Sequence, residues 1–449
     1  MLKKTPVILL LFLVLQSCTH EQPLDKAKLD RFFVALNKHD ESMGSIAMAE
    51  NGKLIYQNAI GYSQINKDLK TPATVKTKYR VGSITKMFTA VMIFQLIEEG
   101  KLSLETRLSV YFPQVPNAQK ITIAEMLGHR SGLHNITGDS VYTTYMTGPK
   151  SEAELIAIIA HPKPDFEPDT KFAYSNSNFE LLGYIVEKLT GNTYAEELKK
   201  RITSKIGLAD TYYGTKANPA NNEAYSYQYT GQWTQMPETD MTIPGGAGAI
   251  VSTPSDLIKF IDALFAGKLI SPANLAQMKT MKDHYGGAMM YGMGMMMIPF
   301  DDKKGFGHGG SIDGFLNFLV YFPDDKLAIA YTSNGVRYSP SEVIMGALNI
   351  YLDRPFAIPE FNTITLNTAD LDKYVGKYSS TKTPLKIDII KNNTVLFVES
   401  GGQKTRFPLE SKGGDKFIYA GITFFQFDPA KKTLTVTQGK VSQLFTKTD

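Results

Sequence analysis

A serine and a lysine three residues apart are the first residues of this sequence whose types and spacing could do chemistry. Ser83 and Lys86 stand in "RVGSITKMFTA", where an apolar helical pattern begins. Residues i and i+3 lie on one face of a helix, so Lys86 Nζ can reach Ser83 Oγ. A serine becomes a nucleophile when a neighbouring base takes its proton, and a lysine is such a base once its pKa is lowered. Taken alone, the four residues more often form a helix cap followed by a surface lysine.

Two later stretches carry groups that could complete such a site. Tyr174 and Asn176 stand in "FAYSNSNFELLG". A tyrosine beside a lysine ammonium can be held partly as phenolate and act as a second base, and an asparagine can both donate to and accept from a substrate amide. His308-Gly309-Gly310 precedes an apolar strand pattern, and its two glycines permit close backbone approach to a ligand. The N–H group of Ser311 could then be an oxyanion donor.

Other candidate motifs favour structural roles. The sequence contains no G-x-S-x-G, so the nucleophile elbow of an α/β-hydrolase is not available, and no local motif supports a Ser-His-Asp triad. His129 and Ser131 in "GHRSGL" are interpreted as a buried structural turn. The methionines of "AMMYGMGMMMIPF" favour packing over a Cu(I) site. No metal and no cofactor is predicted.

The elements that must position these residues form one mixed domain. Residues 45–63 read as two alternating runs around Asn51-Gly52, a hairpin whose turn residues need positive φ. A helix is predicted to start at Ser83, and residues 314–334 read as a second hairpin. Capping boxes predict three more helix starts, at Thr122, Thr193 and Thr253, and Ser339-Pro340 predicts the start of a last helix that runs to about Leu352. Strands at both ends with helices between predict an α/β (α+β) domain in which helices cover one antiparallel sheet.

The last 80 or so residues change character. They consist of short alternating segments separated by turn residues, which predicts a small β-meander or barrel. The predicted organisation is a signal peptide at 1–17, a lipidated tether at 18–29, the main domain at 30–355, a linker at 356–369 and the β unit at 370–449.

The N-terminus predicts export. Lys3 and Lys4 precede an apolar run that is too short to span a bilayer and reads as the core of a signal peptide. Cys18, the single cysteine of the chain, follows in "LQSC", which resembles a bacterial lipobox with Cys18 as the lipidated residue. The alternative is a plain secretory signal with an incidental cysteine. With one cysteine, no intramolecular disulfide can form.

Composition excludes some classes of partner. The 449 residues are 43% hydrophobic and 20% charged, with a net charge of +4, as in an ordinary globular protein. The basic residues form no block, so nucleic acid is not predicted as a partner. The oligomeric state is left open.

Taken together, the motifs resemble the serine β-lactamase and penicillin-binding family, in its branch of class C β-lactamases and D-alanyl-D-alanine carboxypeptidases. Three motifs stand in the family's order: Ser83-Ile84-Thr85-Lys86, Tyr174-Ser175-Asn176 and His308-Gly309-Gly310. The resemblance covers about residues 30 to 355. It implies a sheet with helices on both faces and an all-helical lobe. The β unit resembles, more loosely, the lipocalin-like domains appended to such peptidases.

The resemblance also implies roles for individual residues. Ser83 is the acylated nucleophile, with Lys86 and Tyr174 as its base system. Asn176 binds the substrate amide, and the N–H groups of Ser83 and Ser311 form the oxyanion hole. His308 lines the site where the β-lactamases carry lysine. A histidine near pH 7 is only partly charged, and this difference fits peptidases and esterases better than β-lactamases.

The predicted protein is therefore an exported serine hydrolase, lipid-anchored in a bacterial cell envelope and facing the periplasm or exterior. Its expected substrates are small peptides, β-lactams or esters, with a D-amino-acid peptide of cell-wall material as the first choice. One alternative is a carboxylesterase of the same fold. The other is a non-catalytic penicillin-binding or scaffold protein, against which the intact Ser, Lys, Tyr and Asn argue.

Overall fold

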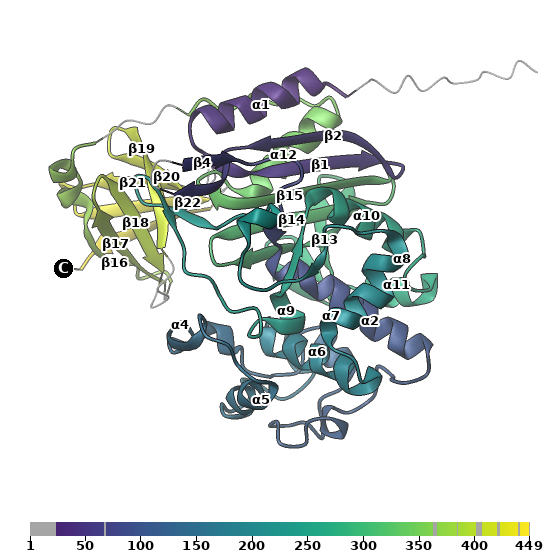
Figure 1. Ribbon diagram of the computed structural model, residues 1–449. Coiled ribbons are helices and arrows are strands. Elements are labelled where there is room, and N and C mark those ends of the chain that lie inside the picture. Colours follow the sequence, from purple (N-terminus) through teal and green to yellow (C-terminus); the bar gives the residue numbers. More distant parts are fainter. Residues whose placement is uncertain are drawn as a thin grey trace, which may run out of the picture.

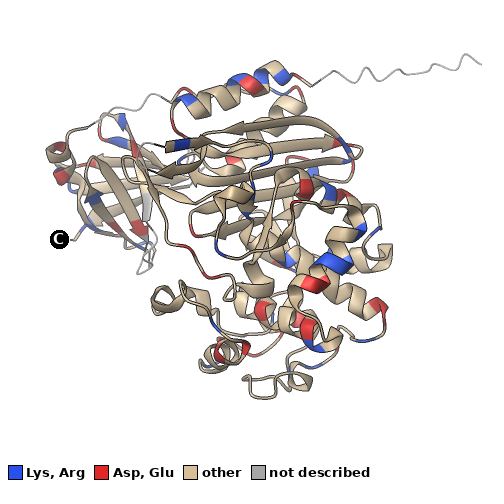
Figure 2. Ribbon diagram, in the orientation of Figure 1, with Lys and Arg blue, Asp and Glu red and all other residues tan. Residues whose placement is uncertain are grey.

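The computed structural model in Figure 1 describes residues 24–66, 69–361, 366–383, 385–400, 406–419, 423–438 and 441–448. The predicted signal peptide and Cys18 lie outside these residues. No helix of the described ranges is long and apolar enough to cross a membrane. Figure 2 shows acidic and basic residues interspersed over the whole described chain.

One eight-stranded antiparallel sheet forms the centre of the larger part, in the order β10-β11-β12-β13-β14-β15-β1-β2. Its strands are β1 (Ser42–Glu50), β2 (Lys53–Ile60), β10 (Asp283–Gly286), β11 (Met289–Tyr291), β12 (Met296–Phe300), β13 (Lys303–Ile312), β14 (Phe315–Phe322) and β15 (Leu327–Val336). The β1–β2 turn has φ of 52° at Asn51 and 74° at Gly52, so the hairpin prediction is confirmed. Strand β1 then pairs with β15, with Ser45 opposite Thr332, which joins the two ends of the domain.

Helices cover both faces of this sheet (Figure 1). Helices α1 (Lys26–Lys38) and α12 (Pro340–Tyr351) pack on one face, around a core that includes Phe33 and Tyr331. Helices α2 (Thr85–Glu98) and α10 (Pro254–Phe265) lie in a second core on the other face. Every residue of α2 from Thr85 to Leu96 is buried, because this helix is apolar almost all round and runs through the middle of that core.

The helical lobe follows α2 and supplies a second wall of the site. Its helices are α3 (Ile123–Leu127), α4 (Tyr142–Tyr145), α5 (Glu152–Ala160), α6 (Asn176–Thr190), α7 (Tyr194–Leu198), α8 (Ser204–Ile206), α9 (Gly245–Gly248) and α11 (Pro272–Met278). Short strands precede α2, namely β3 (Tyr62–Asn66), β4 (Leu69–Pro72) and β5 (Tyr79–Arg80). Others lie between α8 and α10, namely β6 (Tyr212–Tyr213), β7 (Tyr227–Tyr229), β8 (Trp233–Gln235) and β9 (Ile250–Ser252). The capping boxes predicted at Thr122 and Thr193 are present.

The C-terminal unit is a closed barrel. Its strands are β16 (Gly376–Ser379), β17 (Lys386–Asn392), β18 (Val395–Ser400), β19 (Arg406–Gly413), β20 (Lys416–Tyr419), β21 (Thr423–Asp428), β22 (Thr433–Gln438) and β23 (Val441–Lys447). A 3₁₀ helix at Thr368–Tyr374 adds Leu371 and Tyr374 to the barrel core. The predicted fold class, with sheet, flanking helices, helical lobe and small all-β domain, is confirmed.

Arg337 joins the barrel to the larger part. Its guanidinium lies 3.4 Å from Glu410 of β19 and 3.8 Å from Glu41, and it covers the Tyr229 ring at 4.3 Å. A Cβ at Gly231, in the β7–β8 turn, would lie 3.7 Å from Thr394 Oγ1 in the barrel. The two parts therefore meet at the buried charged side chains of Arg337, Glu41 and Glu410, and the β7–β8 turn contacts the barrel beside them.

Candidate active site

Ser83 and Lys86 meet at the start of α2. Ser83 lies in a 3₁₀ turn, Gly82–Ile84, and α2 begins at Thr85, so the prediction that the helix starts at Ser83 is wrong by two residues. In a 3₁₀ turn the side chains at i and i+3 eclipse, which brings Lys86 Nζ to 3.1 Å from Ser83 Oγ. Ser83 is half-buried and Lys86 is fully buried, so Ser83 lies on the solvent side of the pair.

The surroundings of Lys86 favour its neutral form. Its Nζ donates to Asn176 Oδ1 at 2.7 Å and to the Ala247 carbonyl at 2.8 Å. The charged ammonium also donates to Ser83 Oγ, whereas in the neutral amine these two acceptors can take both N–H groups, so that its lone pair can accept from the Ser83 hydroxyl. Burial lowers the pKa of Lys86 to about 7, against a smaller opposing effect of Glu180. Near neutral pH a large fraction of Lys86 can thus act as a base.

Tyr174 stands over this pair from the loop before α6. Its ring centroid lies 5.0 Å from Lys86 Nζ. Burial raises the pKa of Tyr174 far above its ordinary value; the Ser83 side chain opposes this rise, but the two groups do not meet at hydrogen-bond geometry. The predicted partial phenolate is therefore wrong, because desolvation dominates and Lys86 itself is held near neutrality. The phenol is instead a neutral O–H group beside Ser83 and Lys86.

Asn176 opens α6 and braces Lys86. While its Oδ1 accepts from Lys86, its Nδ2 donates to Thr137 Oγ1 at 2.7 Å and its backbone N–H donates to Asn135 Oδ1 at 2.9 Å. The donor that a substrate amide would use is thus engaged by Thr137. Sequence reasoning found Asn176 but missed Thr137 and Asn135, which come from a 3₁₀ turn with no motif of its own.

Strand β13 lies directly against the turn that holds Ser83. A Cβ at Gly310 would lie 1.9 Å from the Val81 carbonyl oxygen, and a Cβ at Gly82, with φ of +54°, would lie 2.8 Å from Ser311 N. Glycine is therefore required at both positions, whereas at Gly309 an added Cβ would make only ordinary contacts of 3.8 Å. The close approach places the Ser311 backbone N beside the Ser83 turn, where it could serve as an oxyanion donor.

A buried arginine ties these two segments together. Arg80, three residues before Ser83, donates to Asp313 Oδ2 at 3.1 Å, to Glu238 Oε2 at 2.7 Å and to the Thr239 carbonyl at 2.8 Å. Asp313 follows Ser311 by two residues and its side chain is fully buried. This network was not predicted, because its members are spread over more than 200 residues of sequence.

His308 lies within an aromatic cluster behind Tyr174. Its Nε2 is 3.1 Å from Tyr291 Oη, which is 3.2 Å from His129 Nε2, and the His129 ring lies 4.2 Å from the Tyr174 ring. Burial, with a contribution from Lys86, lowers the pKa of His308 to about 3. His308 is therefore uncharged at neutral pH, and the expectation of a partly charged histidine is wrong.

His129 occupies a buried turn, as predicted, with φ of 55°. However, its ring lies inside the candidate site, so its role is not only that of a turn. Ser131 donates to Asn178 Oδ1 at 2.6 Å and stays outside the site. Neither His129 nor Tyr291 was predicted as a site residue. The aromatic and histidine content of "GHRSGL" and "YGMGM" is the only signal that could have indicated them.

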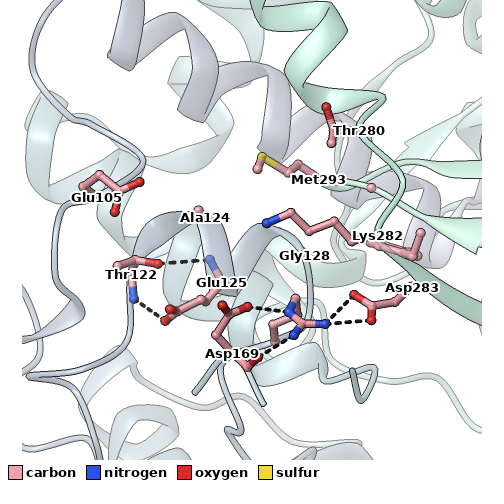
Figure 3. Close-up of a pocket in the computed structure, with 13 residues that line it drawn as sticks. Glu105, Thr122, Ala124, Glu125, Gly128, Asp169, Thr280, Lys282, Asp283 and Met293 are labelled. Carbon is pink, nitrogen blue, oxygen red and sulfur yellow. Dashed lines mark hydrogen bonds and ion pairs between the residues drawn. The ribbon is translucent and has the colours of Figure 1, made fainter. Parts of the chain in front are cut away.

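A separate cavity is lined mainly by polar and charged residues (Figure 3). Tyr291 belongs to both this cavity and the candidate site. Arg130 pairs there with Asp283 at 2.7 Å and with Asp169 at 2.6 Å. Ser83, Lys86 and Tyr174 do not line it. Among the described residues, no group of three or more His, Cys, Asp or Glu is placed to hold a metal ion.

The fold and this geometry define a class of protein, and comparison with known families gives the same result. The chain belongs to the beta-lactamase family, whose model matches residues 29–350. The larger part of the structure is thus a member of the serine β-lactamase and penicillin-binding superfamily of serine hydrolases, as the motifs predicted.

Three similar proteins illustrate the range of the family. Penicillin-binding protein 4* of Bacillus subtilis (strain 168) is 25% identical over 398 residues, which cover 84% of this chain and 87% of that protein. The D-stereospecific amidohydrolase from Streptomyces sp. superposes with a TM-score of 0.61 at 25% identity, over 72% of this chain and 97% of that one. The octameric penicillin-binding protein homologue from Pyrococcus abyssi superposes with a TM-score of 0.65 at 25% identity, over 94% of this chain and 100% of that one.

Proposed function

We propose that the protein hydrolyses amide bonds of D-amino-acid peptides or amides through an acyl-enzyme on Ser83. The observation that carries this proposal is the buried Lys86, 3.1 Å from Ser83 Oγ, whose pKa is lowered to about 7 so that its neutral form can accept the Ser83 proton. A scaffold protein has no need of a lysine desolvated against a serine. The preference for D-amino-acid substrates is supported by the likeness to a D-stereospecific amidohydrolase.

In the proposed reaction, Ser83 Oγ attacks the substrate carbonyl while its proton passes to Lys86 Nζ. The oxyanion that forms is held by the backbone N–H groups of Ser83 and Ser311. The Tyr174 hydroxyl donates a proton to the departing amine and regains one from Lys86. Water then attacks the ester on Ser83 while Lys86 accepts a proton from that water. Lys86 returns this proton to Ser83 Oγ as the ester C–O bond breaks, which releases the acid and restores both residues.

Covalent labelling tests the assignment of the nucleophile. Wild-type protein is incubated with a fluorophosphonate or a fluorescent penicillin, and intact-mass spectrometry locates the adduct. Ser83→Ala should abolish labelling, while Ser109→Ala, a surface serine distant in sequence, should leave it unchanged. Equal labelling of wild type and Ser83→Ala would show that another residue is the nucleophile, and a folded wild type that no acylating probe labels would favour a binding protein.

Substrate comparison then separates the enzymatic alternatives. D-Alanyl-D-alanine peptides and D-amino-acid amides are compared with p-nitrophenyl esters under the same conditions. We expect kcat/KM to be higher for the D-isomer of each amide pair than for its L-isomer. Turnover of esters alone would identify a carboxylesterase instead.

We further propose that the protein is exported and lipid-anchored in the cell envelope through Cys18, a residue outside the described ranges. The apolar run and the "LQSC" segment support this proposal. Expression in a bacterial host with radiolabelled palmitate should label wild type but not Cys18→Ala. Labelling of both variants, or of neither, would contradict lipidation at Cys18.

A further inference from the structure

A chain of hydrogen bonds beside the nucleophile has only one possible direction. At its first end, the backbone N–H of Ser175 donates to His129 Nδ1 at 3.2 Å, and Asn178 Nδ2 lies 3.3 Å from the same atom. A backbone N–H group can only donate, so His129 Nδ1 carries no proton. Neutral His129 therefore carries its proton on Nε2, which faces Tyr291.

The second end of the chain is fixed by a backbone carbonyl. His308 Nδ1 lies within hydrogen-bond distance of the Gly309 oxygen, which can only accept, so Nδ1 carries the proton of neutral His308. Its Nε2 is then an acceptor for Tyr291. Tyr291 Oη consequently accepts from His129 Nε2–H at 3.2 Å and donates to His308 Nε2 at 3.1 Å.

A second proton on His308 would break this chain. Nε2–H of His308 would then point at Tyr291 Oη, which already receives the proton of His129. The Tyr291 hydroxyl would then lose its acceptor. Because Tyr291 is only 1% exposed, this change would cost a buried hydrogen bond. The chain therefore resists protonation of His308 by geometry alone.

The groups that face His308 give it no negative partner. They are Tyr291 on β11, His129 after α3, Tyr174 before α6 and Lys86 on α2. None of these is a carboxylate, and Lys86 can only repel a positive imidazolium. Burial acts in the same direction and holds the pKa of His308 below its ordinary value.

We propose that Tyr291 and His129 are positioning residues that fix His308 as the uncharged Nδ1–H tautomer, so that the site favours substrates with an uncharged leaving group over substrates that end in a carboxylate. This specificity rests on the proposed function of Ser83. A fixed cation at the position of His308 would attract a terminal carboxylate, and the hydrogen-bond chain removes that attraction. Amides and esters of D-amino acids fit such a site better than peptides with a free C-terminal D-residue.

The tautomer of His308 can be measured without any substrate. The chain has seven histidines, so protein labelled with ¹⁵N- and ¹³C-histidine gives few ring signals, and His308→Asn identifies the one of interest. In wild type we expect the Nδ1–H pattern, unchanged from pH 4.5 to 8. Tyr291→Phe should release Nε2, which changes its ¹⁵N signal, and should raise the titration of His308 by about one pH unit or more, so that the ring begins to gain a second proton at the acid end of this range. A wild-type His308 that titrates near pH 6.5, or a Tyr291→Phe spectrum identical to wild type, would overturn the proposal.

Activity provides the second readout. D-Alanyl-D-alaninamide and D-alanyl-D-alanine differ only in a terminal carboxamide or carboxylate. For wild type we expect kcat/KM to favour the amide by about tenfold or more at every pH from 4.5 to 8. In Tyr291→Phe this preference should shrink as the pH falls and His308 becomes charged, mainly through a lower KM for the acid. Tyr331→Phe is the matched control, since it removes a buried hydroxyl hydrogen-bonded to Ser42 in the core on the other face of the sheet.

The two readouts separate failure of this inference from failure of the proposed function. If Ser83 is labelled but wild type and Tyr291→Phe show the same amide preference at every pH, the specificity role is wrong and the acyl-enzyme stands. If Ser83 is never acylated, the proposed function fails, while the histidine spectrum still decides whether the chain of hydrogen bonds exists.

Discussion

The rate of acylation at Ser83 should follow the titration of Lys86. Burial lowers the pKa of Lys86 from an ordinary 10.5 to about 7. At pH 7 an ordinary lysine is neutral in about one molecule in 3,000, whereas Lys86 is neutral in about half of the molecules. The second-order rate of labelling by a fluorophosphonate should therefore rise about tenfold per pH unit below pH 6.5 and level off above about pH 7.5.

Substitution of Lys86 tests the same reasoning. Lys86→Arg keeps a positive charge but cannot be deprotonated, so it should lower the labelling rate by about 10³-fold across the whole pH range. Circular dichroism would check that the variant is folded. A wild-type rate that still rises between pH 8 and pH 10, or a Lys86→Arg rate close to wild type, would refute a neutral Lys86 as the base.

The same pKa shift has a consequence for stability whose sign can be derived. Because folding lowers the pKa, the fold disfavours charged Lys86. The cost begins below the unfolded pKa near 10.5, grows as the pH falls, and is complete, at about 5 kcal/mol, below the folded pKa near 7. Lys86→Met removes this cost. Its effect on the free energy of unfolding should therefore be more favourable at pH 7 than at pH 9, by about 2 kcal/mol.

Two features make this stability measurement specific. The hydrogen bonds to Asn176 and Ala247 that Lys86→Met also removes cancel when the two pH values are compared. Glu180 is also buried, and burial raises its pKa to about 8, so both proteins should carry Glu180→Gln to prevent a second titration in the same range. Urea unfolding at pH 7 and pH 9 measures the difference. Equal effects of Lys86→Met at the two pH values would contradict the lowered pKa.

Three more predictions follow from packing and charge elsewhere. Gly82→Ala places a Cβ within 2.8 Å of Ser311 N at a φ of +54°. The rate of Ser83 labelling should therefore fall by about 100-fold. An unchanged rate would show that the turn can shift freely. Burial raises the pKa of Glu41 to about 8, so its contribution to stability is present at pH 4.5 and lost as the pH rises through 8. Glu41→Gln should raise the midpoint of the thermal transition of the sheet, relative to wild type, at pH 8 but not at pH 4.5. Equal shifts at both pH values would argue against the raised pKa. Asp313→Asn leaves Arg80 with one carboxylate fewer in a buried network and should lower the free energy of unfolding by about 3 kcal/mol in urea titrations, whereas no loss would mean that Glu238 alone compensates the charge.

Local rules predicted the elements well. The Asn51-Gly52 turn, the caps at Thr122 and Thr193 and the final helix after Ser339 depend on residues within a few positions of one another, and all are present. The start of α2 was misplaced because a distant strand decides it. Ser311 packs on Gly82 and holds the Ser83 turn in a 3₁₀ form, a contact that no local pattern contains.

The site was predicted only in part, because some of its contacts also join residues that are far apart in the sequence. Ser83, Lys86, Tyr174, Asn176 and His308 stand in recognisable motifs, and the structure brings them together. The Ala247 carbonyl has no sequence signature, since every residue carries one, and yet it accepts one of the two Lys86 hydrogen bonds. Protonation states also escaped prediction, because they depend on how completely α2, α6 and β13 exclude water from Lys86, Tyr174 and His308.

The described chain contains three large hydrophobic cores besides a small cluster around Tyr79 and Phe315, and this division has a consequence for how the protein loses its structure. The barrel core is built only from residues of the C-terminal unit, from Leu371 to Phe445, and contributes nothing to the cores on the two faces of the sheet. Each core is a potential cooperative unit, so heating should give more than one calorimetric transition and no single melting temperature. Ser83 labelling should disappear with the transition of the sheet, while the barrel keeps its own independent melting behaviour.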